Sequence, residues 1–394
     1  MECRRAHLIR PRPKPPMKHN PMRRRLLLHT AAWPMGGALA AVGLSACAPT
    51  TPVRLAMLSG LTGAVSDLGV AARDGALLAI EHARAAGQAL ELLEFDDGQT
   101  PGKLPEVALR IASAQVAAVI GPVTSSIAHA WIPLAQQQGL LSVSPTVTSD
   151  DFSGLDDLFF RVCASTRKYA TQSAAFAVQR RGWRRLALIR DDSNAAYTRS
   201  WADFFAAKAR SLGATVAEAV VYQGPLAPRQ AQTVLQQALA QRPETLVLVA
   251  NASDTALLAQ LARQSPQAPA LQAAEWASTE QLIVRGGRAV EGMLVSQYFD
   301  RSSRAPAYLE FLQRFEQRYR RQPGFAEVAA YDAAQVLLQA LPQQTPGEAL
   351  KATLLRLRTF RGLQDPIIFD DYGDSQRPMV MTEIRNGRFI TFGA

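Results

Sequence analysis

The sequence predicts an α/β fold of two doubly wound lobes, each with a parallel sheet covered by helices on both faces. Three observations support this prediction. From residue 53 onward, short apolar runs alternate with segments whose apolar residues recur every three or four positions. This alternation fills two successive series, 53–162 and 170–298, and each is long enough to form a domain. The composition, with 48% hydrophobic and 19% charged residues among 394, is that of a folded globular protein.

The predicted strands are short apolar runs bounded by turn residues: 54–58, 90–95, 116–120, 140–143, 186–189, 215–221, 246–249 and 293–296. The predicted helices between them are amphipathic: 67–86, 172–181, 198–212, 229–240 and 255–263. In such sheets, ligands bind at the carboxyl ends of strands, beside helix N-termini whose free N–H groups attract anions. We therefore expect the ligand site in the loops that follow residues 58, 120, 143, 189, 249 and 273.

Two of these loops are rich in hydroxyl groups. The first is Gly121-Pro122-Val123-Thr124-Ser125-Ser126, and the second is Ser144-Pro145-Thr146-Val147-Thr148-Ser149. Hydroxyls and backbone N–H groups at a helix start can bind a carboxylate without Arg or Lys. The alternative is that Ser125 and Ser149 are simple N-caps, because Ser is among the preferred residues at that position.

Residues 1–46 have the layout of a secretory signal peptide. Nine Lys and Arg residues precede the apolar stretch 26–44, which is broken by Gly and polar residues. A membrane-spanning helix needs about 20 consecutive apolar residues, so export is the better interpretation. The sequence leaves open whether Met1, Met17 or Met22 is the start. It also leaves open whether export uses the general or the twin-arginine route, whose signal Arg23-Arg24-Arg25 resembles.

Residues 44–47, LSAC, resemble the lipobox of bacterial lipoproteins. Cys47 is therefore the predicted lipidation site, and residues 47–52 form the predicted tether. The alternative for a lone Cys is a small buried hydrophobic residue. Several lipid chains would hold the mature protein on a membrane surface. The sorting residue after the Cys is Ala48 and not Asp, which favours the outer membrane without deciding between the two membranes.

The net charge of +10 does not predict a nucleic-acid partner. Most of the excess lies in residues 1–46, and the rest of the chain has 34 basic and 32 acidic residues, close to balance. After cleavage only Cys47 and Cys163 remain, so no intrachain disulfide is expected. Cys163 is expected to be buried and inert.

The sequence contains none of the motifs GxSxG, HExxH, CxxC or GxxxxGK. His82 and His129, which lie beyond the signal peptide, have no metal-ligand partner at a recognisable spacing. The paired acids at 96–97, 150–151 and 156–157 are typical of caps and turns. We therefore expect neither catalysis nor a bound cofactor or metal.

Several segments together resemble the leucine/isoleucine/valine-binding family of periplasmic solute-binding proteins of ABC transporters, which are type I periplasmic binding proteins. They occur in collinear order over residues 53–394: LAMLSGLTGAVSDLGVAARDGALLAIEHARAAG, the turn Phe95-Asp96-Asp97, VIGPVTSS, SPTVTS, Phe160-Arg161, Tyr197 after Asp191-Asp192, and Phe369-Asp370-Asp371-Tyr372-Gly373-Asp374. Each motif is weak by itself, but their order and spacing are fairly specific.

The resemblance implies two lobes joined by a hinge of three crossovers, with the ligand enclosed between them. Lobe one would comprise 53–164 plus 297–369, and lobe two 165–296 plus 370–394. The loops with Ser125, Ser126, Thr146 and Thr148 would hold the carboxylate and ammonium of an amino acid. Glu275 would fix the ammonium, and Tyr197 would line the lobe-two side, with Trp276 beside them.

The chain departs from branched-chain amino-acid binders at two positions where they carry aromatic residues, Leu68 and Ala252. Trp276 either compensates for this loss or indicates an aromatic or amide ligand. The resemblance therefore implies an amino-acid-like solute, an amide or a small carboxylate, and not leucine in particular.

The expected function is that of a monomeric extracytoplasmic lipoprotein that delivers its solute to an ABC transporter permease. The alternative is a non-transport envelope lipoprotein of the same fold, either a regulator of a cell-wall enzyme or a ligand sensor. Such a protein would tend to have a degenerate cleft, whereas the presence of Thr148 and Glu275 favours real ligand binding.

Overall fold

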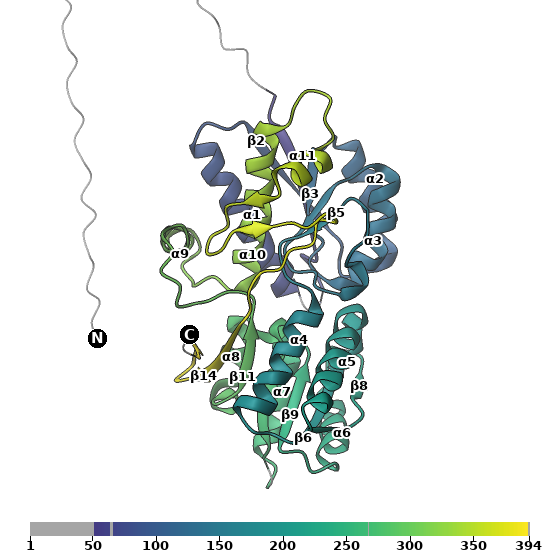
Figure 1. Cartoon of the computed structure of the whole chain (residues 1–394), viewed down its shortest axis with the longest axis vertical. Coiled ribbons are helices and arrows are strands. Elements are labelled where there is room, and N and C mark those ends of the chain that lie inside the picture. Colours follow the sequence, from purple (N-terminus) through teal and green to yellow (C-terminus); the bar gives the residue numbers. More distant parts are fainter. Residues whose placement is uncertain (1–50, 64–65, 267, 393–394) are drawn as a thin grey trace, which may run out of the picture. The chain divides into compact units, whose positions relative to one another are not determined.

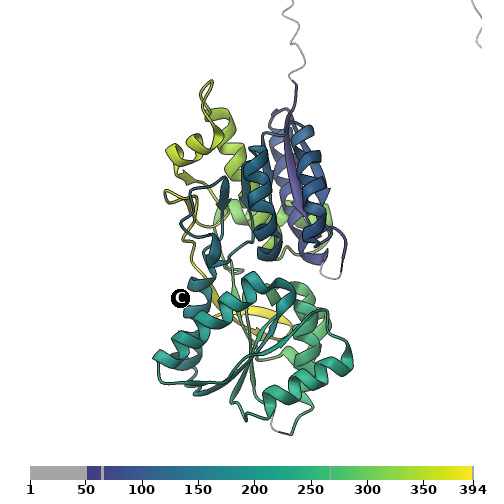
Figure 2. The ribbon, with the colours of Figure 1, turned by 90° about the vertical axis from the view of Figure 1, so that its right-hand side faces the viewer.

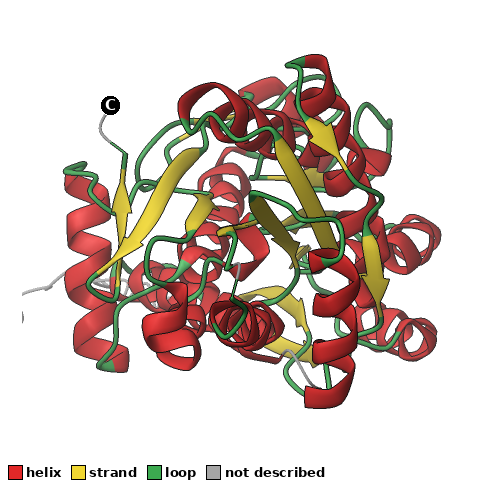
Figure 3. Cartoon of the chain, turned by 90° about the horizontal axis from the view of Figure 1, so that it is seen from below, coloured by secondary structure: helices red, strands yellow, loops and turns green. Residues whose placement is uncertain are grey.

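The computed structural model describes residues 51–63, 66–266 and 268–392 (Figure 1). The predicted signal peptide and the predicted lipidation site Cys47 lie outside the described residues. The described chain forms two large sheets, each surrounded by helices (Figure 3). We call the five-stranded sheet with its helices lobe one and the eight-stranded sheet with its helices lobe two. This architecture confirms the predicted fold class.

The sheet of lobe one has five strands in the order β2-β1-β3-β4-β5, and all neighbours pair in parallel. Leu55 and Met57 of β1 join one hydrophobic core, whereas Ala56 and Leu58 join another on the opposite face. Burial on both faces explains the continuous apolar run of residues 55–58 in β1. The strands are β1 (Val53–Ser59), β2 (Leu90–Asp96), β3 (Ala118–Ile120), β4 (Ser142–Ser144) and β5 (Phe159–Arg161).

Helices cover both faces of this sheet. On one face lie α1 (Ser66–Ala85) and α10 (Phe325–Ala340), and on the other lie α2 (Leu104–Ser113) and α3 (Ser125–Gln138). Helices α1 and α10 are so close that a Cβ on Gly75 would lie 2.1 Å from the backbone oxygen of Glu327. Glycine at position 75 therefore permits this contact. Lobe one is completed by α9 (Pro306–Tyr319), α11 (Leu350–Leu357), β12 (Thr359–Phe360) and β13 (Ile367–Ile368).

The sheet of lobe two has the order β15-β14-β11-β10-β9-β6-β7, and β8 also pairs with β6. Its pairs are parallel except at one edge, where β14 is antiparallel to both of its neighbours. The strands are β6 (Arg185–Asp191), β7 (Thr215–Val216), β8 (Val220–Tyr222), β9 (Thr245–Val249), β10 (Ala270–Ala273), β11 (Leu294–Gln297), β14 (Val380–Arg385) and β15 (Arg388–Thr391).

Helices also cover both faces of the second sheet (Figure 2). One face packs against α4 (Thr166–Ala175), which continues into a π-helical turn at Phe176–Arg180, and against α5 (Ala195–Ser211). The other face packs against α6 (Pro228–Leu239), α7 (Ala252–Arg263) and α8 (Glu280–Gly286).

The chain passes between the lobes three times: between β5 and α4, between β11 and α9, and between β13 and β14. The last passage is the yellow segment that runs down to β14 in Figure 1. Two buried ion pairs hold it. Arg161 Nε donates to Asp374 Oδ1 at 2.8 Å, and Arg377 Nη1 donates to Asp332 Oδ2 at 2.6 Å.

Candidate ligand-binding cleft

Four polar residues from the strand-end loops line a small cavity between the two lobes: Thr124, Ser125, Thr146 and Asn194. Three of them follow β3 and β4, and Asn194 follows β6, as expected for the carboxyl ends of parallel strands. The remaining lining is apolar or aromatic: Leu68, Val123, Tyr197, Trp276, Tyr298 and Phe325. The structure therefore brings together Ser125, Thr146, Tyr197 and Trp276 from the predicted set.

The hydroxyls of Ser125 and Thr146 differ in what they offer to a ligand. Ser125 Oγ accepts a hydrogen bond from the backbone N–H of Ser149 at 3.3 Å, so its own proton can be donated to a ligand. Thr146 Oγ1 already donates to the backbone oxygen of Val123 at 2.6 Å, so it is left as an acceptor. Ser125 could thus donate a hydrogen bond to one atom of a polar ligand, and Thr146 could accept one from another atom.

Helix α3 points its N-terminus at this part of the site. Thr124, the N-cap residue, makes no side-chain capping bond. The N–H groups of the first turn therefore keep their partial positive charge, which favours an anion. The N–H of Ser126 is already used, because it donates to Asn194 Oδ1 at 3.0 Å. The predicted Ser126 thus contributes to an inter-lobe bond and does not line the cavity; it faces an open groove of about 800 Å³.

Thr148 is fully buried and lies outside the cavity lining. Its hydroxyl accepts from Thr166 Oγ1 at 3.0 Å, and its backbone oxygen accepts from the N–H of Thr166 at 2.7 Å. Thr148 is therefore placed to hold the start of α4, directly after the first crossing between the lobes.

Aromatic side chains form the apolar walls. Tyr197 and Trp276 meet edge to face with ring centroids 5.9 Å apart, and Tyr298 stacks on Phe325 at 4.6 Å. Such pairs add about 0.5–1.5 kcal/mol each beyond the area they bury. The sequence analysis missed Tyr298 and Phe325. The signal that could have found Tyr298 is its position directly after β11, which overlaps the predicted strand 293–296. No comparable signal in the sequence marks Phe325.

Glu275 is completely buried and is not among the residues that line the cavity. Its Oε1 accepts from the Tyr197 hydroxyl at 2.9 Å. Its Oε2 accepts from Trp201 Nε1 at 3.0 Å and from the Ser296 hydroxyl at 2.9 Å. Burial raises the pKa of Glu275, and hydrogen bonds from its own backbone N–H and from these side chains oppose the rise. The predicted contact of Glu275 with a ligand ammonium stays a prediction.

The cavity itself is small, about 10 Å³, which is room for about one water molecule. Two hydrogen bonds between the lobes accompany this tight arrangement. One joins Ser126 and Asn194, and in the other the Ser149 hydroxyl donates to the backbone oxygen of Ala196 at 2.7 Å. A solute of amino-acid size requires the walls of the cavity to move apart.

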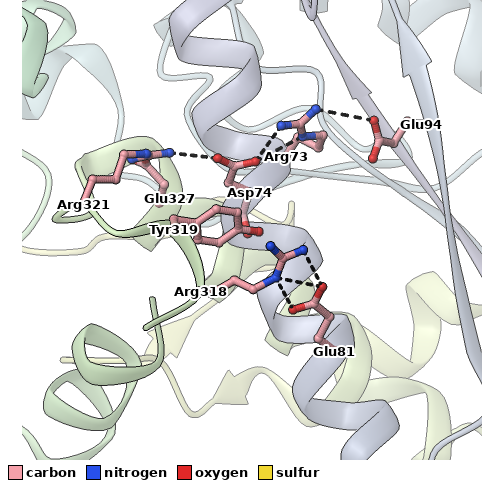
Figure 4. Close-up of polar contacts among 8 residues, drawn as sticks. All are labelled: Arg73, Asp74, Glu81, Glu94, Arg318, Tyr319, Arg321 and Glu327. Atoms are coloured by element: carbon pink, nitrogen blue, oxygen red, sulfur yellow. Dashed lines mark hydrogen bonds and ion pairs between the residues drawn. The ribbon is translucent and has the colours of Figure 1, made fainter. Parts of the chain in front are cut away.

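A polar network supports the start of α10 (Figure 4). Phe325, the first residue of this helix, lines the cavity. Arg321 donates to Asp74 Oδ2 at 2.9 Å and also pairs with Glu327. Glu327 in turn accepts from the N–H of Gly324 at 2.9 Å, the residue before Phe325. Asp74 and Glu327 are both buried. Arg321 is therefore the cation that pairs with Glu327, and it shares Asp74 with Arg73, which lies 2.7 Å from Asp74 Oδ1.

Within the described ranges, no group of three or more His, Cys, Asp or Glu side chains is arranged to hold a metal ion. No helix among the described residues combines the length and apolarity needed to cross a membrane. Cys163 is buried, and its thiol donates to the backbone oxygen of Pro145 at 2.6 Å. Burial raises the pKa of this thiol to about 12, so it is unreactive at neutral pH.

Two α/β lobes with three connections and a cavity between their strand ends define a two-lobed binding protein. The family model described as "Periplasmic binding protein" matches residues 52–388, and the chain belongs to this family. The family consists of binding proteins and not of enzymes, in agreement with the expectation from the sequence.

Named relatives span nearly the same length. The "Leucine-, isoleucine-, valine-, threonine-, and alanine-binding protein" of Pseudomonas aeruginosa is 24% identical over 331 residues, which are 82% of this chain and 87% of the relative. A leucine binding protein from Thermotoga maritima is 25% identical, with a TM-score of 0.79 over 86% of this chain and 98% of its own. A solute binding protein from R. palustris in complex with benzoate shares the fold, with 17% identity and a TM-score of 0.78 over 87% of this chain and 96% of its own.

Proposed function

We propose that this protein is an extracytoplasmic solute-binding lipoprotein that captures an amino acid or a similar small carboxylate between its lobes and delivers it to an ABC transporter permease. The observation that carries the proposal is the cavity at the strand ends. It combines the Ser125 hydroxyl and the N-terminus of α3 on one lobe with the aromatic residues Tyr197 and Trp276 on the other. The first pair suits a carboxylate, and the second suits an apolar body.

Relatives support the choice of a small carboxylate. The Pseudomonas aeruginosa protein is named for five amino acids, and the protein from R. palustris was solved with benzoate. The named amino acids and benzoate share a carboxylate attached to a small organic group. They differ in that only the amino acids carry an amino group. The proposed carboxylate partners are accordingly Ser125 and the first turn of α3, with Thr146 as an acceptor for a donor on the solute.

The proposed mechanism is closure of the lobes around the solute. Solute would bind first to the loops of lobe one, and lobe two would then close by bending at the crossings near Ser165, Gln297 and Asp370. Closure would bring Asn194 and Tyr197 onto the solute and form the bond between Ser126 and Asn194. The closed form would be the one presented to the permease. Lipidation of Cys47 would keep the protein at the membrane.

A second candidate function is a non-transport envelope lipoprotein, either a regulator or a sensor. The observation that favours it is the size of the cavity, which has room for about one water molecule. In a protein of this kind the aromatic walls would fill the cleft permanently, and the ordered surface across the two lobes would be recognised by a partner.

A thermal-shift screen of the purified protein against amino acids, small amides and aromatic carboxylates tests the proposal. A solute present at 100 times its Kd stabilises the folded state by about 2.7 kcal/mol, which is a readable rise in Tm. The matched variant is Ser125→Ala, which removes the proposed donor, and Ser113→Ala on α2 is the control because its hydroxyl bonds only within its own helix. A shift that Ser125→Ala abolishes supports the proposal. The non-transport function is favoured if no compound raises the Tm and if the small-angle scattering profile of the protein is the same with and without these compounds.

A further inference from the structure

The lining of the cavity offers different partners to the carboxylate and to the ammonium group of an α-amino acid. None of the described residues that line the cavity carries a carboxylate or a cationic side chain. An ammonium group that enters this site therefore has no acidic partner among these residues.

The acidic residue predicted for this role, Glu275, already accepts hydrogen bonds at both oxygens. A carboxylate has about four lone-pair sites. In Glu275, the side chains of Tyr197, Trp201 and Ser296 donate to three of them. Tyr197 donates to Glu275 and also lines the cavity, whereas Glu275 is not among the lining residues.

Other acids close in sequence to lining residues belong to different surfaces. Asp67, next to Leu68, lines a separate groove of about 470 Å³ together with Glu280 and Glu327. Asp150 and Asp203 line the open groove of about 800 Å³, where Asp150 pairs with Arg167. Neither groove shares a residue with the cavity lining. These acids therefore do not replace the missing partner.

The carboxylate end of a solute is provided for. The Ser125 hydroxyl has a free proton, the first turn of α3 carries partial positive charge, and Asn194 accepts at Oδ1 and so offers its amide Nδ2 as a donor. The aromatic rings could attract a cation, and Thr146 Oγ1 could accept one hydrogen bond from an ammonium group. Without a carboxylate partner, these interactions recover less than the cost of burying the charge.

We propose that this site selects a carboxylate with an apolar or aromatic body and without an α-ammonium group. The inference rests on the proposed solute-binding function and narrows it. Trp276 and Tyr197 would act as specificity-determining residues, because they provide ring surfaces and keep the solute away from Glu275. The ligand would thus be the deaminated relative of an amino acid or an aromatic acid.

Matched pairs of ligands that differ only in the ammonium group test the inference. Isothermal titration calorimetry would compare L-phenylalanine with 3-phenylpropanoate and L-leucine with 4-methylpentanoate, and benzoate would serve as a rigid aromatic acid. We expect the ammonium-free member of at least one pair to bind 10-fold or more tightly than its amino acid. Amino acids that bind as tightly as their partners, or more tightly, overturn the inference but leave the proposed function standing. Absence of binding by every compound overturns both.

The variant Glu275→Gln separates a contact with ammonium from a role in orienting Tyr197. It keeps the size of the side chain and removes its charge. If Glu275 acts through Tyr197 and Trp201, the affinities of both members of a pair change by the same factor. A loss restricted to the amino acid shows that Glu275 reaches the ammonium and overturns the inference. Ser125→Ala, which removes the carboxylate donor, should weaken both members equally. Circular dichroism and Tm establish that each variant is folded.

Discussion

The backbone N–H of Ser126 in lobe one donates a hydrogen bond to Oδ1 of Asn194 in lobe two at 3.0 Å. The two residues adjoin Ser125 and Ala195, where α3 and α5 begin, so the bond ties together the starts of two helices from different lobes. Asn194 also lines the cavity. The side chain of Asn194 therefore both joins the two lobes and lines the proposed solute site.

The first prediction concerns this bond. Asn194→Ala removes one inter-lobe hydrogen bond, which contributes about 0.5–1.5 kcal/mol. We expect the solute-free variant to populate open forms more than the original protein does, with a larger radius of gyration in small-angle scattering. Gln236→Ala, an exposed change on α6, is the control. Scattering profiles that coincide for all three proteins would show that Asn194 does not hold the lobes together.

The second prediction concerns Thr146. Its hydroxyl donates to the backbone oxygen of Val123 at 2.6 Å in a buried setting. Thr146→Val keeps the shape but leaves that oxygen without its partner, so we expect the free energy of unfolding to fall by about 1–3 kcal/mol. Urea unfolding measures this loss. Thr171→Val is the matched control, because its hydroxyl bonds to Arg167 within an exposed helix turn. Equal effects of the two changes would contradict the prediction.

The pattern of apolar runs predicted the two parallel sheets because burial on both faces leaves a clear signal in sequence. Predicted strands 54–58, 90–95 and 246–249 are confirmed within β1, β2 and β9. The run 215–221 instead forms the two short strands β7 and β8, because Ala217 to Ala219 leave the sheet between them. The strands β14 and β15 were missed because they pair antiparallel at the edge and carry charged residues such as Glu383 and Arg385.

The third prediction concerns pH. Asp97 is 1% exposed, and burial raises its pKa from 3.8 to about 6. Between these two values the folded state binds more protons than the unfolded state, so the free energy of unfolding falls as pH rises. The difference between these two pKa values corresponds to a loss of about 3 kcal/mol in the free energy of unfolding, complete once the pH exceeds the folded pKa.

Asp97→Asn isolates this contribution. The amide keeps an oxygen for the backbone N–H of Gln99, which Asp97 Oδ1 accepts at 2.7 Å, and it cannot ionise. We expect the variant to gain stability relative to the original protein between pH 4 and pH 7, measured by urea unfolding at each pH. Stability curves that stay parallel over that range would show that Asp97 does not titrate there.

The fourth prediction concerns the network in Figure 4. Arg321→Met leaves buried Glu327 without its cation and Asp74 with Arg73 alone. Because Arg321 is partly exposed, we expect a moderate loss of about 1–3 kcal/mol in unfolding free energy, and weaker solute binding through displacement of Phe325. Arg318→Met is the control, since its pair with Glu81 is exposed to solvent and should contribute less to stability than the pairs of Arg321. A larger effect of the control would refute this account of the network.

The site was less predictable than the fold. Hydroxyl-rich loops at strand ends indicated Ser125 and Thr146, because local sequence sets the ends of strands and the starts of helices. Phe325 could not be found this way, since its place in the cavity depends on the packing of α10 against α1 some 250 residues earlier in the chain. The burial of Glu275 depends on Trp201 and Ser296, which only the folded sheet brings to its two oxygens.

The three passages between the lobes also determine when each lobe can be finished during synthesis. Lobe one begins with β1 at Val53 but needs α10, which ends at Ala340, to cover one face of its sheet. Lobe two begins with α4 at Thr166 but needs β14, which ends at Arg385, to pair with β11. Neither lobe can therefore complete its core while a large part of the chain is still missing. In a polypeptide made in this order, the two cores are completed only after α10 and β14 have been synthesised.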